Sequence, residues 1–185
     1  MLSDKKIMDL MKEEEIIIKP FKRENLGPNS YDLTLSKKAK FIAAMADPFD
    51  LTSDNIIDYM EISLPFVLKP GRILVFMTNE IVGCKTKTLG IISQRSSLAR
   101  LPLVINFSNL LDTGFVGVLS GAMINQTDFN LYIKPDIRIL QIMFESVDGE
   151  VKRRYDERKW SKNLNQLGFE VPEFKVDKEW RKEEI

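Results

Sequence analysis

The chain has 185 residues, 44% hydrophobic and 29% charged, which is typical of one soluble globular domain. Basic and acidic residues both number 27, so the basic excess of a polynucleotide-binding protein is absent. The sequence has no histidine and a single cysteine, which excludes Ser-His and Cys-His catalysis, an internal disulfide and a cysteine-rich zinc site. No hydrophobic run is long enough to span a membrane and no secretory signal is evident, so we expect a cytoplasmic protein without a membrane partner.

The first predicted element is a helix from Ser3 to Glu14. Ser3 suits the N-cap position, and Asp4 places negative charge in the first turn, where the helix dipole favours it. The apolar run at residues 16–18 then predicts a short strand, which ends at Pro20.

Short β-like runs separated by turn signals follow. They cover residues 31–35, 66–68, 73–77, 88–93, 103–107, 116–124, 131–133 and 137–144. Many short strands spaced by roughly 8–12 residues predict a β-barrel or sandwich. After Glu145 the composition becomes strongly charged. We therefore predict a barrel domain with its N-terminal helix at residues 1–145, and a tail at residues 146–185 that lies over a site or a neighbouring subunit.

Two polar clusters carry the functional signal. The first offers hydroxyl and guanidinium groups suited to phosphate oxygens, from Arg95, Ser96, Ser97 and Arg100. The second, at residues 112–117, places Asp112 beside a glycine-aromatic turn suited to holding a water or a sugar. Taken alone, the first run is more often a solvated turn, and an aspartate before glycine is most often a turn former.

These clusters and three further segments resemble motifs of the dCTP deaminase and dUTP diphosphatase family. Residues 29–35 resemble its early strand, 95–101 its phosphate motif, 112–117 its D-x-G-[WF]-x-G turn, and 134–144 its late strand, with Asp136 where glycine is usual. Tyr155, Lys162 and Gln166 match the spacing of its C-terminal segment. Each match is weak alone, but five in the right order are specific.

The resemblance implies a mainly β fold, a distorted jelly-roll barrel with an N-terminal helix and a C-terminal tail. It also implies a homotrimer with sites between subunits. The implied substrate is a deoxynucleoside triphosphate, dUTP or dCTP, which itself carries the Mg²⁺ cofactor, so no protein metal site is expected. No polynucleotide partner is expected.

The resemblance also implies roles for individual residues. Asp112 orients or activates a water against the α-phosphate. The phosphate oxygens are held by Arg95, Ser96, Ser97, Arg100 and Gln141, and the site is closed from the tail by Tyr155, Lys162 and Gln166. Phe115 is equally suited to the barrel core and to packing on the deoxyribose, and the base edge is read around Ser120, Gly121 and Ala122.

Ala122 decides the expected chemistry. In the deaminating branch of the family, a glutamate lies ten residues after the motif aspartate, and here that position holds Ala122. Hydrolytic deamination needs a group that takes a proton from water and delivers one to the base, which a methyl group cannot do. Ser120, expected on the same strand face, is a poor acid and a poor base. We therefore predict a dUTP diphosphatase that forms dUMP and pyrophosphate.

Two alternatives stay open. In the first, the chain is a dCTP deaminase that is either naturally divergent or inactivated by a glutamate-to-alanine replacement at position 122. In the second, it is a non-catalytic nucleotide-binding protein of the same fold. The loop at residues 101–111 is one residue shorter than is usual in deaminases and leaves the preferred base undecided.

Overall fold

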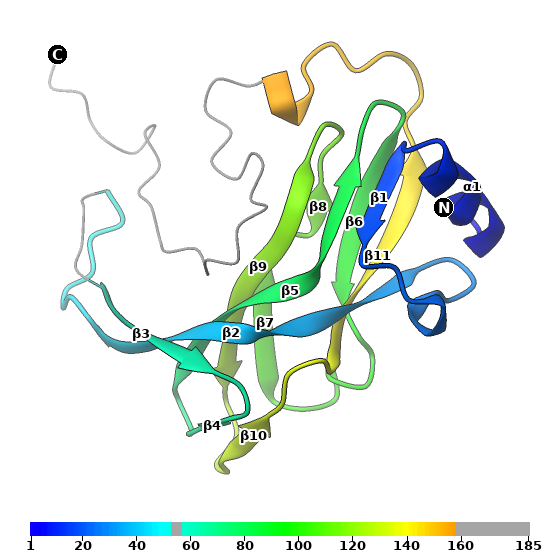
Figure 1. Cartoon of the computed structure of the whole chain (residues 1–185). Helices are drawn as coiled ribbons and strands as arrows, with labels where there is room; N and C mark the ends of the chain where they lie inside the picture. Colours follow the sequence, from blue (N-terminus) through cyan, green and yellow to red (C-terminus); the bar gives the residue numbers. More distant parts are fainter. Residues whose placement is uncertain (53–56, 158–185) are drawn as a thin grey trace, which may run out of the picture.

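The computed structural model describes residues 1–52 and 57–157. The fold is mainly β, with a strongly curled sheet and a helix at the N-terminus, which confirms the predicted fold class (Figure 1). Helix α1 spans Asp4–Lys12, and the Ser3 hydroxyl caps it by accepting a hydrogen bond from the backbone N–H of Lys6 at 3.3 Å. Within the described residues, no helix has the length and apolar character needed to cross a membrane.

Eleven strands are seen among the described residues, and they form two sheets. The nine-stranded sheet contains β1 (Ile16–Lys19), β2 (Tyr31–Met45), β3 (Ile57–Ser63), β5 (Ile73–Cys84), β6 (Thr88–Gln94), β7 (Leu103–Phe107), β8 (Leu110–Leu111), β9 (Val116–Asn125) and β11 (Arg138–Ser146). A small second sheet pairs β4 (Phe66–Leu68) with β10 (Leu131–Ile133). Two short 3-10 helices, η1 (Arg23–Asn25) and η2 (Tyr155–Glu157), complete the described part.

The order of the strands explains the curl of the large sheet. Its main path runs β7-β9-β5-β2-β11-β6-β8, so β7 and β8 lie at opposite ends. In the sequence, however, only Ser108 and Asn109 separate these two strands. Two residues cannot span an open sheet, since the chain reaches at most about 3.3–3.6 Å per residue. The sheet therefore curls until its ends meet, and the Asn109 carbonyl accepts a hydrogen bond from the Ile92 N–H of β6 at 2.8 Å.

Large apolar side chains fill the inside of the curled sheet. Tyr31, Phe76 and Phe144 are among the largest fully buried side chains. Removing each from water stabilises the fold by about 1.5–3 kcal/mol. The Tyr31 hydroxyl accepts a hydrogen bond from the Lys22 N–H at 2.8 Å, and burial raises the pKa of this phenol.

The predicted strands at residues 66–68, 103–107 and 131–133 have the bounds expected, but other strands differ. Strand β2 continues to Met45 and β5 to Cys84, well past their predicted ends. Both strands carry register irregularities, which break the alternation of inward and outward side chains on which the prediction depended. Strand β3 was missed because it pairs only with β2 and none of its side chains is fully buried.

Candidate active site

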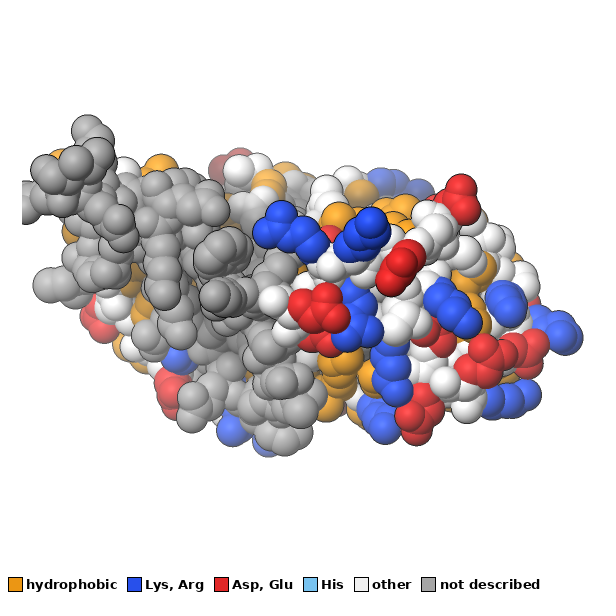
Figure 2. All heavy atoms as spheres, turned by 90° about the horizontal axis from the view of Figure 1, so that it is seen from above, with side chains coloured by type: hydrophobic (Ala, Val, Ile, Leu, Met, Phe, Trp, Pro, Cys, Tyr) orange, Lys and Arg blue, Asp and Glu red, His pale blue; other side chains and the backbone are white. Residues whose placement is uncertain are grey.

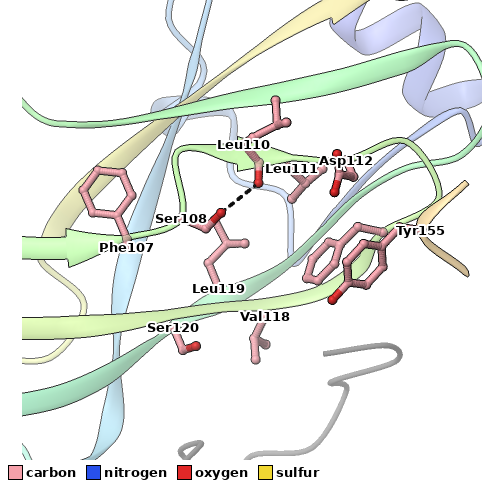
Figure 3. A pocket seen from close by; sticks show the side chains of 10 residues that line it. Phe107, Ser108, Leu110, Leu111, Asp112, Val118, Leu119, Ser120 and Tyr155 are labelled. Atoms are coloured by element: carbon pink, nitrogen blue, oxygen red, sulfur yellow. Dashed lines mark hydrogen bonds between the residues drawn. The ribbon is translucent and has the colours of Figure 1, made fainter. Parts of the chain in front are cut away.

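Asp112 lies half-buried in a pocket between β9 and the segment that joins β7 to β8 (Figure 3). The cavity volume of this pocket is about 120 Å³, which is smaller than the range of about 300–1,000 Å³ for small-molecule sites. Its lining is Phe107, Ser108, Leu110, Leu111, Asp112, Phe115, Val118, Leu119, Ser120 and Tyr155. Four predicted site residues, Asp112, Phe115, Ser120 and Tyr155, are thus brought together.

The turn after Asp112 is fixed by hydrogen bonds to two neighbouring strands. The Thr113 hydroxyl donates to the Thr88 carbonyl at 2.8 Å, and the Gly114 N–H donates to the Cys84 carbonyl at 2.7 Å. The Phe115 N–H donates back to the Asp112 carbonyl at 3.0 Å, and the Phe115 ring packs into the barrel core. Phe115 therefore belongs to the core as well as to the pocket lining.

The start of the tail packs on this turn. The Tyr155 N–H donates to the Thr113 carbonyl at 2.9 Å, and the rings of Phe115 and Tyr155 meet edge to face with centroids 5.4 Å apart. Gly114 has φ +92°, and a Cβ there would lie 2.5 Å from an Asp156 carboxylate oxygen and 2.9 Å from the Tyr155 nitrogen. Glycine is therefore required both by the backbone conformation and by the tail. The predicted tail residues Lys162 and Gln166 lie outside the described residues.

The side chains on the two faces of β9 have different surroundings. Figure 3 shows Leu119 pointing toward Ser108 and Leu110, whereas Ser120 points to the other side of the strand. Ala122 follows Ser120 by two positions and so shares its face. A Cβ on Gly121, which faces the core, would lie 2.3 Å from the Asn106 carbonyl oxygen, so packing alone requires this glycine. The predicted reading of the base by residues 120–122 stays a prediction.

The predicted phosphate residues gather around the other end of β6. Arg95 directly follows this strand, and its carbonyl accepts hydrogen bonds from the N–H groups of Leu98 and Ala99, both at 3.0 Å, which forms a tight turn. Ser96, Ser97 and Arg100 are exposed on or just after this turn. Gln141 on β11 lies opposite Ser93 and donates from its amide to the Ser93 hydroxyl at 2.9 Å.

The chain thus places the predicted site residues in two separate halves. Asp112 follows Leu111, which pairs with Gly90 near the start of β6, while Arg95 follows the end of the same strand. The five steps along the chain from Gly90 to Arg95 span roughly 16 Å at the usual strand rise. Within a single chain, the carboxylate and the phosphate residues therefore do not line one pocket.

Two neighbours of the phosphate motif were not among the predicted site residues. Asp32 on β2 forms ion pairs with Arg95 at 3.2 Å and with Arg138 on β11 at 3.4 Å. Arg138 lies within the late-strand motif, so the sequence carried a signal for it. Phe107 and Ser108 of the Asp112 pocket belong to the 101–111 loop, which the sequence associated with the choice of base, but only closure of the sheet places them in this pocket.

Buried acids support the scaffold on either side of these halves. Burial raises the pKa of Glu80, whose carboxylate accepts hydrogen bonds from the N–H and hydroxyl of Thr34. Burial acts the same way on Glu15, but hydrogen bonds from Lys87, Thr86 and Thr88 outweigh it and lower the pKa of this carboxyl. These bonds tie the segment before β1 to the start of β6.

Charges of both signs are mixed on one face of the molecule. On the face seen from above in Figure 2, lysine and arginine side chains are interspersed with aspartate and glutamate over the coloured area. In the part of the chain that the structure describes, no three carboxylate, cysteine or histidine side chains are grouped to hold a metal ion. That Mg²⁺ is carried by the substrate stays a prediction.

Comparison with known proteins identifies the family. The dCTP deaminase-like family matches residues 1–147. A relative named "dCTP deaminase, dUMP-forming" from Hydrogenobaculum sp. is 31% identical over 80% of this chain and 82% of its own, and one of the same name from Dictyoglomus turgidum is 29% identical over 95% of each chain. The crystal structure of 2'-deoxycytidine 5'-triphosphate deaminase from Agrobacterium tumefaciens has a TM-score of 0.61 at 19% identity, covering 77% of this chain and 47% of that one.

The chain therefore belongs to the dCTP deaminase-like family, as the motifs predicted. Members of this family are enzymes of nucleotide metabolism, and the solved structure shows the same fold.

Proposed function

We propose that this chain binds a pyrimidine deoxynucleoside triphosphate and forms the nucleoside monophosphate dUMP. The observation that carries this proposal is Asp112, a carboxylate held at a rigid turn in a pocket whose other walls are mainly apolar. A carboxylate in such a place can orient a water and accept its proton as the water attacks the α-phosphate. The Mg²⁺ that arrives with the triphosphate supplies charge neutralisation at the phosphates.

The second half of the site holds the phosphates. Arg95 and Arg100 supply guanidinium groups, and Ser96 and Ser97 supply hydroxyls on an exposed turn, all suited to phosphate oxygens. Gln141 lies one strand away and contributes amide donors. Pyrophosphate is the leaving group when the α-phosphate is attacked, and in this proposal these residues stabilise its charge.

Two routes lead to dUMP, and different observations favour them. The names of the relatives favour deamination of dCTP, which releases ammonia and gives dUTP, followed by hydrolysis of the dUTP to dUMP and pyrophosphate. The residues of this chain favour hydrolysis of dUTP, because Ala122 on β9 offers no group for proton transfer at the base. We propose dUTP hydrolysis as the main activity and keep dCTP deamination, in a divergent or inactivated form, as the second candidate. Binding without turnover is the third.

We further propose a homotrimer in which each complete site combines halves from neighbouring protomers. The separation of Asp112 from Arg95 along β6 supports this assembly, because a single triphosphate must meet both. The described start of the tail, which already covers the Asp112 turn, supports closure of the site from the C-terminal side.

The test is incubation of the full chain with Mg²⁺ and either dUTP or dCTP, with chromatography of the products and assays for ammonia and pyrophosphate. The proposal expects dUMP and pyrophosphate from dUTP, with dCTP unchanged. Ammonia released from dCTP would instead establish the deaminase. If neither nucleotide reacts, restoring the glutamate by Ala122→Glu separates an inactivated deaminase, which regains ammonia release, from a binding protein, which does not.

A further inference from the structure

A row of polar side chains crosses three adjacent strands at the phosphate half of the site. Asp32 on β2 lies directly opposite Gln141 on β11, which in turn lies opposite Ser93 on β6. Residues directly opposite each other in antiparallel strands share a face of the sheet. Asp32 therefore lies on the face that carries Gln141, although an acid beside a triphosphate is expected to repel it.

Asp32 uses each of its two oxygens to hold a different arginine. The Nε atom of Arg95 is 3.2 Å from Oδ1, and the Nη1 atom of Arg138 is 3.4 Å from Oδ2. The Asp32 side chain is 14% exposed, whereas the arginine side chains are 32% and 36% exposed. A guanidinium has five N–H donors, so these contacts occupy a minority of the donors, and two positive charges meet one negative charge.

The turn that leads into Arg138 is fixed as well. Asp136 has φ +63°, a conformation rare for residues other than glycine. The Asn79 amide donates to the Asp136 carboxylate at 2.9 Å and to the Leu35 carbonyl at 3.1 Å, and the Asp136 N–H donates to the same carbonyl at 2.9 Å. Arg138 therefore begins β11 from an ordered turn and is held at its tip by Asp32.

We propose that Asp32 is a positioning residue, which holds Arg95 and Arg138 side by side as a pair that grips the triphosphate. This makes Arg138 a phosphate-binding residue in addition to those of the Arg-Ser-Ser turn. The inference rests on the proposed function. Its physical basis is that two long side chains already ordered by one carboxylate lose less conformational freedom when the anion binds. The remaining donors of both forks are suited to neighbouring phosphate oxygens.

The direction in which Asp32→Asn changes the affinity for the triphosphate tests the proposal. Removing a negative charge near an anion strengthens binding if Asp32 acts only through its charge. If Asp32 orders the two arginines, Asp32→Asn weakens binding of a non-hydrolysable dUTP analogue with Mg²⁺, by roughly tenfold. Binding of dUMP, which lacks the β- and γ-phosphates, changes much less. Both affinities are measured by titration calorimetry on the full chain.

Asp9→Asn is the matched control, because Asp9 also bridges two cations, Lys5 at 3.0 Å and Lys12 at 3.4 Å, on the surface of α1. It removes the same charge and leaves analogue binding unchanged. Arg138→Gln and Arg138→Lys both weaken analogue binding, since lysine keeps the charge but lacks the fork. These two variants carry the test if Asp32→Asn does not fold, as judged by thermal unfolding.

Unchanged or tighter analogue binding by folded Asp32→Asn overturns the positioning role, and unchanged binding by both Arg138 variants overturns the role of Arg138. A wild-type chain that binds neither the dUTP analogue nor dUMP overturns the proposed function and this inference with it. A wild-type chain that binds both, with no loss in these variants, overturns this inference alone.

Discussion

The two ends of strand β6 present opposite chemistry. Near its start lies Asp112, a single carboxylate among apolar walls, on a turn held rigidly by hydrogen bonds. At its end lies an exposed, cationic turn with Arg95. A nucleoside triphosphate has the same division, with a base and sugar at one end and a multiply charged anion at the other. In the proposed function, one short strand therefore carries both halves of the site while keeping Asp112 away from the phosphate-binding residues of its own chain.

The largest effect on the contrast between the two ends of β6 is expected from Asp112→Asn, which removes the carboxylate at one of them. Asparagine keeps the shape but cannot accept a proton, so the turnover rate falls about 10²–10⁴-fold while the affinity for substrate changes little. Steady-state kinetics of dUMP formation measures both quantities. Asp128→Asn, which removes an exposed carboxylate outside the pocket, is the control and leaves the rate unchanged. Full activity in Asp112→Asn would remove Asp112 from the mechanism.

The next prediction concerns the separation of the halves. Arg95→Gln and Asp112→Asn each inactivate a homo-oligomer, but co-assembled chains of the two kinds regain activity, because some shared sites receive an intact Arg95 from one chain and an intact Asp112 from another. The measurement is activity after refolding the two variants together, compared with mixing them without refolding. No recovery would show that both halves of a working site come from one chain.

Gly114→Ala tests the contact between the tail and the Asp112 end. The added Cβ meets both Tyr155 and Asp156, so the tail leaves the turn and residues 153–154 become sensitive to trypsin. Gly71→Ala is the matched control, since its φ is +70° but nothing lies within 4 Å of its Cβ. Both variants bear a backbone strain of about 1–3 kcal/mol, and only Gly114→Ala exposes the tail. Equal cleavage in the two variants would contradict the docking.

The smallest expected effect concerns Glu15, which braces the start of β6. Because hydrogen bonds lower its pKa in the folded state, its stabilisation is complete well above the ordinary value of 4.5 and is lost as the pH falls through the lowered pKa. Glu15→Gln therefore reduces the free energy of unfolding by about 1–3 kcal/mol at pH 7, and the difference from wild type narrows below pH 4. Denaturant unfolding at both pH values measures this.

The neighbouring Glu14→Gln is the control for Glu15. Glu14 forms an exposed ion pair with Lys85 at 3.1 Å, so its removal has the smaller effect at pH 7. A Glu15 variant as stable as the Glu14 variant at neutral pH would show that the start of β6 does not depend on this brace.

The sequence predicted the elements that have strong local signals. The prediction failed where contacts between distant parts of the chain determine the structure. Ser3 was identified as a cap because capping depends on a few adjacent residues. The extension of β2 to Met45 was missed because it pairs with β3, whose pattern is weak. Ordered motifs predicted Asp112 and Arg95, but their spacing in the chain says nothing of their separation along β6. The motifs contain Asp32 and Arg138, but their pairing required the register of β2 against β11.

The packing of the tail on Gly114 also bears on the order in which the protein is made. Tyr155 follows Asp112 by 43 residues in the sequence, so a ribosome completes the barrel turn well before it delivers the segment that packs on it. A truncated chain that ends after β11 keeps the hydrogen bonds from this turn to β5 and β6 but lacks the bond from the Tyr155 N–H and the aromatic cover. The Asp112 pocket therefore has its Tyr155 wall only after this later segment has been synthesised.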